Sequence, residues 1–214
     1  MNYGNTLDTI SDYIATQMGR ADDKVFIRLV RYSVKYWRAF LLRQHLERNK
    51  NSELYFQSIV RELEPTKKFN YNATELESTH VKVTTVAIPE IIKFNGREPF
   101  NYVGSSDFTR PFTFLRAEDI AYFFDVKYGK NNRVGYFPDG DKIYIFSCKN
   151  VGEVLIRHAF FDFDVVQREN DEQSCEDIDV NMRMPSDKIH TIVLGLLSGE
   201  FSFQNDKADK IETE

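Results

Sequence analysis

Apolar residues at helical spacing predict helices near both ends of the chain. In residues 6–18 the apolar side chains recur every three or four positions, and Gly19 follows directly. These side chains are Leu7, Ile10, Ile14 and Met18. Such spacing builds one apolar face of a helix, for which Thr6 is a suitable N-cap and Gly19 a suitable end. A second, longer helix is predicted from Asp22 or Asp23 to about Asn49, and a last one over residues 185–198.

Between these helices the apolar residues no longer recur every three or four positions, and short strands are predicted. Residues 81–88 are rich in β-branched side chains and end at Pro89, which is typical of a strand. Residues 133–137 and 142–146 flank an Asp-Gly turn at 139–140 and predict a hairpin. Other expected strands cover 54–63, 91–94, 108–114 and 153–166, with a short helix at 116–124, an acidic loop at 169–179 and a polar tail at 204–214.

The order of helices, then strands, then a helix predicts an α+β fold. It combines an N-terminal helical hairpin with one long helix, a predominantly antiparallel β domain and a C-terminal amphipathic helix. The expected boundaries are 1–50 for the hairpin and 51–184 for the β-rich domain. The C-terminal helix and its end then take 185–203, and the polar tail takes 204–214.

Composition places the chain among globular proteins, because 42% of its residues are hydrophobic and 29% charged. The 18 Phe and 11 Tyr favour strands and interface cores. No apolar run approaches the roughly 18 residues of a membrane span, and the first residues have no secretory-signal pattern. Cys148 and Cys175 have no CxxC spacing, so free thiols are expected in a cytoplasm or in particles assembled there.

The net charge of −5 hides an uneven distribution along the chain. Residues 20–50 hold nine basic and three acidic side chains, a net charge of +6. Residues 162–214 hold five basic and fourteen acidic ones, a net charge of −9. This asymmetry indicates either a helix that faces a polyanion or self-association through opposite surfaces.

Five cations on the long helix recur at spacings of four and three, and they form what we call the basic stripe. Its members are Lys24, Arg28, Arg31, Lys35 and Arg38. At 100° per residue they fall within an arc of roughly 80°. Their mutual repulsion needs a neutralising partner, which leaves three alternatives: a protein interface, nucleic-acid phosphates, or a solvated face offset by acids of the same chain.

Motifs for catalysis or for cofactors were not found. The sequence has no GxSxG, GxxxxGK or GxGxxG, and its four histidines (His45, His80, His158 and His190) are never four residues apart. No catalytic, cofactor-binding or metal site is therefore assigned. Asp162 and Asp164 are the exception, because on a strand both carboxylates point the same way and could hold a divalent cation. A polar strand face is the simpler interpretation of this pair.

The long helix also carries a resemblance to a known family. The run from Asp23 to Asn49, with Tyr36-Trp37-Arg38 in its middle, ends in Arg43-Gln44 followed by Arg48-Asn49. After it come Tyr55-Phe56-Gln57, an Ile-Pro element at Ile88-Pro89, and the amphipathic helix that starts at Pro185-Ser186-Asp187. This series is similar to structural proteins of crAss-like and other tailed bacteriophages that form rings of the head-to-tail connector.

The resemblance implies a non-enzymatic virion protein, at the portal vertex or tail, that needs no cofactor. Its implied state is an oligomeric ring, usually twelvefold, next to the portal protein and other connector or tail proteins, with a possible passing contact to genomic DNA. A ring needs two different surfaces that meet, and the charge asymmetry offers such a pair. Trp37, Phe201 and Phe203 are the expected interface anchors. The alternatives are a DNA-binding or packaging accessory protein and a cation-dependent enzyme using Asp162 and Asp164.

Overall fold

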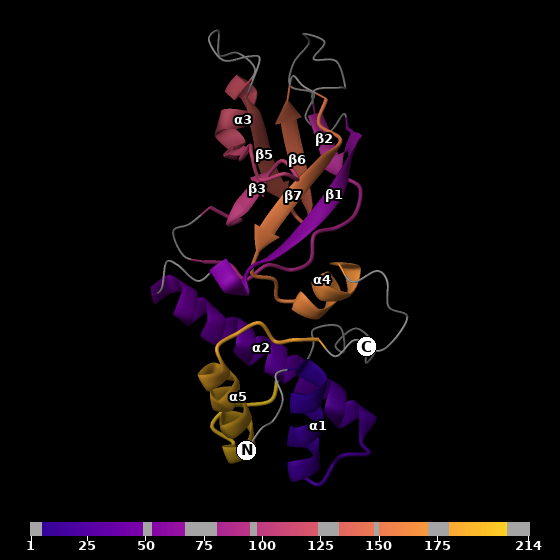
Figure 1. The fold of residues 1–214 in the computed structure, drawn as a ribbon, viewed down its shortest axis with the longest axis vertical. Coiled ribbons are helices and arrows are strands. Elements are labelled where there is room, and N and C mark those ends of the chain that lie inside the picture. Colours follow the sequence, from indigo (N-terminus) through magenta and orange to yellow (C-terminus); the bar gives the residue numbers. More distant parts are fainter. Residues whose placement is uncertain are drawn as a thin grey trace. The chain divides into compact units, whose positions relative to one another are not determined.

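The computed structural model describes residues 6–48, 53–66, 81–94, 98–123, 133–147, 150–170 and 180–204. The chain forms two compact units. The first, the helical unit, draws on residues 1–56, 91–94 and 159–214, and the second, the sheet unit, draws on residues 57–90 and 95–158. Figure 1 labels most elements of both, but not β4 or η1. The α+β class expected from the sequence is confirmed, and the sheet is mixed but mostly antiparallel.

The helical unit contains α1 (Leu7–Gln17), α2 (Lys24–Arg48), the 3-10 helix η1 (Glu53–Tyr55), α4 (Phe163–Asn170) and α5 (Ser186–Ser198). Thr6 caps α1 through its side chain, which accepts from Thr9 N, and Gly19 follows the helix at φ 68°. The predicted helices at 6–18, 22–49 and 185–198 are therefore confirmed. Met18, expected on the apolar face of α1, is instead exposed.

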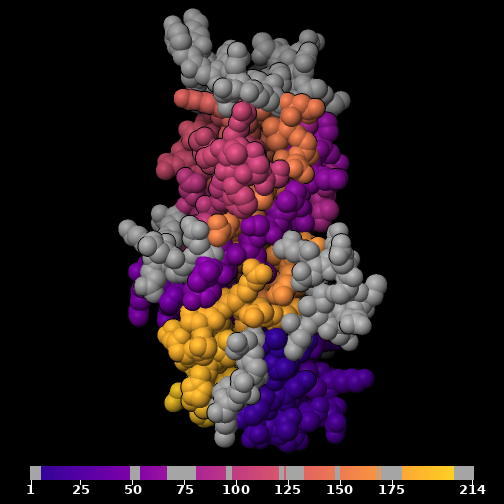
Figure 2. Space-filling view, in the orientation of Figure 1, coloured from indigo at the N-terminus to yellow at the C-terminus, as the bar shows by residue number. Residues whose placement is uncertain are grey.

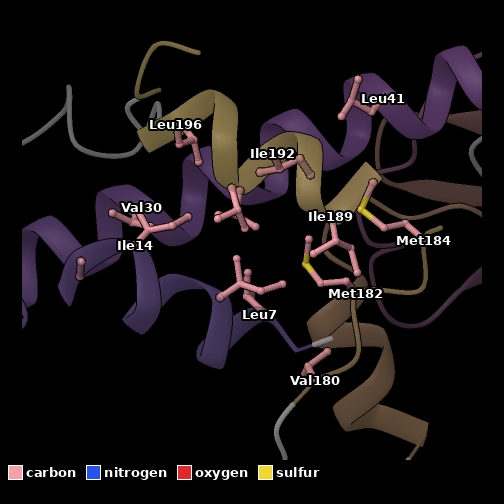
Figure 3. Close-up of a cluster of buried hydrophobic side chains, with 14 of the residues drawn as sticks. Leu7, Ile14, Val30, Leu41, Val180, Met182, Met184, Ile189, Ile192 and Leu196 are labelled. Carbon is pink, nitrogen blue, oxygen red and sulfur yellow. The ribbon is translucent and has the colours of Figure 1, made fainter. Parts of the chain in front are cut away.

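One apolar core joins three of these helices. Figure 3 shows side chains of α1, α2 and α5 converging, together with residues of the segment before α5. The buried members from α2 include Val30, Val34 and Leu41, and those from α5 include Ile189, Ile192 and Leu196. In Figure 2 the yellow α5 region lies against the indigo and purple helices. This core stabilises the unit because each helix buries its apolar face on the other two.

The sheet unit contains β1 (Gln57–Pro65), β2 (Val81–Thr84), β3 (Tyr102–Gly104), β4 (Thr113–Phe114), β5 (Val134–Asp139), β6 (Lys142–Ser147) and β7 (Glu153–His158), with α3 (Ala117–Phe123). The strand order is β3-β7-β1-β2-β6-β5-β4. The two ends of this order also approach one another, because the residues just before β4 pair with β3: Phe112 N donates to Val103 O and Gly104 bridges Pro111. The sheet thus curls toward a small barrel.

The predicted hairpin is confirmed as β5 and β6, with Gly140 at φ 63° in the turn, and the predicted short helix is α3. Residues 81–88 and 108–114 form strands only over Val81–Thr84 and Thr113–Phe114. The strand expected at 54–63 corresponds to β1, whereas no strand was expected at the position of β3. Gly104 has no room for a side chain beside the Tyr102 ring, and a three-residue strand shows too little alternation to predict.

Two strand predictions were wrong. Residues 91–94 form only an isolated bridge, between Ile91 and Phe160. The long strand expected over 153–166 ends at His158, and its last part turns into α4. Phe163 and Val166 are buried three residues apart, which is helical spacing that the run of aromatic and β-branched residues concealed. The predicted loop at 169–179 begins inside α4, and the rest of it lies outside the described residues, as do Cys148, Cys175 and 205–214.

Candidate assembly surface

The helix α2 carries most of the residues singled out from the sequence. Its first turn is fixed by Asp23, whose Oδ1 accepts from Phe26 N at 2.9 Å and whose Oδ2 pairs with Arg20 at 2.5 Å. The Phe26 N–H and the Arg20 guanidinium lower the pKa of Asp23. The Arg20 guanidinium also lies 4.2 Å from the centre of the Phe26 ring. Asp23 is therefore the cap of the long helix.

Arg38, the last member of the basic stripe, is fully buried inside the helical unit. Its Nε donates to Met182 O at 2.6 Å and its Nη1 to Phe160 O at 3.0 Å. The guanidinium lies 4.0 Å from the centre of the Phe163 ring. Burial lowers the pKa of Arg38 to about 9, which leaves it charged at neutral pH. Arg38 thus joins three segments of its own chain and is not available to a partner.

Lys35, one turn earlier, holds the two carboxylates that the sequence offered as a cation site. Its Nζ lies 2.7 Å from Asp164 Oδ1 and 3.4 Å from Asp162 Oδ1. The two acids stand at the start of α4, so the strand geometry expected for them is wrong. Their position at a helix N-terminus is favourable for negative charge. The charge that faces the pair is the Lys35 ammonium, and among the described residues no three His, Cys, Asp or Glu side chains come together as a metal site.

The remaining three cations of the basic stripe divide into one internal and two external residues. Arg31 forms an ion pair with Asp8 of α1. Lys24 and Arg28 are exposed, and neither has an ion-pair partner among the described residues. Three of the five positions expected to meet a partner are therefore used within the chain. For Lys24 and Arg28, contact with a protein partner or with nucleic-acid phosphates stays a prediction.

The three expected interface anchors pack on one another within the helical unit. The Trp37 and Phe201 rings stack with centroids 4.0 Å apart, and Trp37 Nε1 donates to Ser202 O at 3.1 Å. The Phe203 ring lies 5.5 Å from that of Phe26. Gln204 N then donates to Ser33 Oγ at 2.8 Å. Residues 201–204 thus follow the surface of α2 in their own chain, and their role as anchors toward another copy stays a prediction.

Sequence reasoning missed a second apolar face of α2, which we call the outer stripe. Its members are Val25, Leu29, Tyr32, Tyr36 and Phe40. They lie within an arc of roughly 80°, centred roughly 130° from the core residues Phe26, Val30, Val34 and Leu41. Val25 is 80% exposed, Phe40 44% and Tyr36 39%, whereas Leu29 and Tyr32 are half-buried. The spacings of four, three, four and four residues between its members were a sequence signal for this face. The sequence alone does not separate these residues from the apolar residues that face the core.

The sheet unit holds two further groups of polar residues with internal partners. His158 is buried, and its Nδ1 accepts from Asn101 N at 3.1 Å. In the loop after β3, Asp107 accepts from Ser105 Oγ and from Thr109, and these bonds lower the pKa of Asp107 to about 2. The loop presents Phe108, which is 49% exposed at φ 58°. These contacts order the loop and the β3 edge.

One known protein family matches both the helical unit and the sheet unit. A family model described as phage tail ring protein 2 matches residues 7–212, which is nearly the whole chain. A comparison with curated proteins found no match. Among the described helices, none has the length and apolarity that crossing a membrane requires. Because the match spans both units, the chain belongs to the phage tail ring protein 2 family of crAss-like phages, a family of structural ring proteins of the virion.

Proposed function

We propose that the chain forms a homomeric ring in the head-to-tail connector of a tailed phage, between the portal protein and the tail. The observation that carries this proposal is the family match over residues 7–212. A role in catalysis is not part of it, because the one carboxylate pair considered for a cation faces Lys35. The ring is expected to be twelvefold, and genomic DNA would pass through its channel.

The helical unit supports a role in assembly through how its charges are arranged. Arg38, Lys35 and Arg31 each join α2 to another segment of the same chain, which makes the unit rigid before any partner binds. Rigid, preorganised surfaces lower the entropic cost of association. Lys24, Arg28 and three side chains of the outer stripe (Val25, Tyr36 and Phe40) remain exposed on the same helix. Such a unit is suited to repeated contact with identical copies.

The proposal is tested by the mass of the purified protein, alone and mixed with the portal protein of the same phage. Mass photometry should show a discrete species near twelve times the monomer mass of 25.1 kDa, formed either spontaneously or on the portal. A different discrete multiple would keep the ring but correct its copy number. A protein that stays monomeric and binds no virion component would contradict the proposal.

A further inference from the structure

Three side chains of the outer stripe, Val25, Tyr36 and Phe40, are exposed, whereas Leu29 packs against the core of the helical unit and Tyr32 packs on Phe161. The outer stripe extends over fifteen residue steps of α2, which is about 22 Å at 1.5 Å per residue. The rings of Tyr36 and Phe40 both lie nearly perpendicular to the Trp37 ring, at centroid distances of 5.4 and 5.6 Å. This aromatic group is therefore held in place although its outer side faces solvent. A preformed apolar patch rimmed by polar residues is typical of a protein interface.

The charges beside the outer stripe indicate the kind of surface that it meets. Arg28 lies roughly 40° from Tyr32 around the helix, and Lys24 lies roughly 40° beyond Arg28. Both cations are exposed and have no acidic partner among the described residues. The complementary surface should therefore combine an apolar centre with acidic residues at its rim.

The outer face of α5 has this composition. Leu194 is 48% exposed at its centre. Asp187 in the first turn and Glu200 just past the helix end are both exposed, and Asp187 Oδ2 lies 3.6 Å from Lys188 Nζ. The opposite side of α5 is buried in the core against Val30, Val34 and Leu41 of α2. The outer stripe and the outer face of α5 are therefore two different surfaces of one copy, and Phe201, just past α5, stacks on Trp37 beside Tyr36 and Phe40.

We propose that the outer stripe of one copy packs against the outer face of α5 in the next copy of the same chain. This inference rests on the proposed ring and adds the two surfaces that build it. Two different surfaces that meet make a heterologous contact, which propagates from copy to copy and forms a ring when the rotation between copies closes. Lys24 and Arg28 of one copy then face Asp187 and Glu200 of its neighbour.

The first test removes the apolar contact. The double variant Val25→Glu/Phe40→Glu places two charges in the outer stripe, at exposed side chains that are not members of the buried core. We expect ring formation to be lost, with a monomer whose far-ultraviolet circular dichroism matches that of the wild type. The matched control is Leu54→Glu/Val86→Glu, which changes two other exposed apolar residues, 84% and 54% exposed, and should leave the ring mass unchanged.

The second test exchanges the charges. Lys24→Glu/Arg28→Glu should weaken ring formation at least tenfold at low salt. Adding Asp187→Lys/Glu200→Lys to the same chain should restore it, because every copy then carries both reversed surfaces. A merely structural role of these residues would give no rescue, since among the described residues no ion pair joins Lys24 or Arg28 to Asp187 or Glu200 within one copy. Failure of the rescue would overturn the assignment of α5 as the partner surface.

The third test identifies the neighbour directly. A photo-crosslinking benzoylphenylalanine replaces Phe40, and copies with normal and heavy nitrogen isotopes are mixed before assembly. Crosslinked peptides that join light to heavy chains at α5 would support the inference. Crosslinks within one chain only, or to the portal protein, would overturn it. If the wild type forms a ring and Val25→Glu/Phe40→Glu forms the same ring, only this inference fails; if the wild type never assembles, the proposed function fails with it.

Discussion

Arg28 and Arg38 are ten residues apart on one helix and have the same side chain, yet their surroundings differ completely. Arg28 is exposed, whereas Arg38 is buried and donates to the carbonyls of Met182 and Phe160. A buried guanidinium is tolerated because these carbonyls and the Phe163 ring replace part of its hydration. The contribution of each arginine to the free energy of unfolding thus depends on what surrounds its side chain and not on its place in the basic stripe.

We predict that Arg38→Ala lowers the free energy of unfolding by about 3 kcal/mol, because it leaves two buried carbonyls without donors and opens a cavity. Arg28→Ala should change it by less than about 0.5 kcal/mol. Urea denaturation followed by fluorescence of the single tryptophan, Trp37, measures both. Arg38→Lys should not rescue, since an ammonium cannot reach both carbonyls in the guanidinium geometry. Equal effects of the two alanine variants would contradict this account.

At the scale of elements, the end of α5 and the segment after it determine how the C-terminal part meets α2. Gly199 ends the helix in the left-handed conformation at φ 79°. Phe201 N then donates to Gly195 O, and the Phe201 ring returns over Gly195 to stack on Trp37. A Cβ at position 195 would lie 2.5 Å from this ring. Glycine inside the helix is therefore required by packing, although it lowers helix propensity.

We predict that Gly195→Ala destabilises the protein by about 2 kcal/mol through overpacking against Phe201. In a Phe201→Ala background the same change should be neutral or stabilising by up to about 1 kcal/mol, because only the helix propensity of alanine remains. A double-mutant cycle on urea unfolding measures this coupling. The emission of Trp37 should shift to the red in Gly195→Ala if the stack is displaced. Additive effects of the two substitutions would show that the ring and Gly195 are not in contact.

At the scale of the whole molecule, assembly couples stability to concentration. Each unit has its own core, the helical one around α1, α2 and α5 and the sheet one around Val81, Leu115 and Phe146. Only folded copies associate, so association increases the free energy of unfolding of each copy. A ring protein should therefore be more stable at concentrations where the ring is filled.

We predict that the thermal midpoint of the wild type rises with each tenfold increase in protein concentration across the range of assembly. Differential scanning fluorimetry at several concentrations, with the mass checked at each, measures this dependence. Val25→Glu/Phe40→Glu, expected to be monomeric, should show a constant midpoint over the same range. A wild-type midpoint that does not change while the mass changes would mean that the contact contributes little to folded-state stability.

The sequence by itself determined the elements whose signals are local. The helices at both ends, the hairpin around Gly140 and the short helix α3 follow from caps, turn residues and periodicity, which act within a few residues. The resemblance of the long helix to phage ring proteins also came from contiguous residues. Where two local signals competed, as in residues 159–166, the aromatic run predicted a strand and the helical spacing of Phe163 and Val166 was overlooked.

The tertiary structure alone decided which of the similar residues serve the interior and which remain outside. Helical spacing placed Arg28 and Arg38 on one stripe without telling which of the two was covered. Coverage depends on partners distant in sequence: Asp8, Phe160, Asp164 and Met182 take up the cations, and α5 covers Val30 but not Val25. Burial is a property of the packed chain, and one-dimensional periodicity defines faces of a helix but not the neighbour that each face meets.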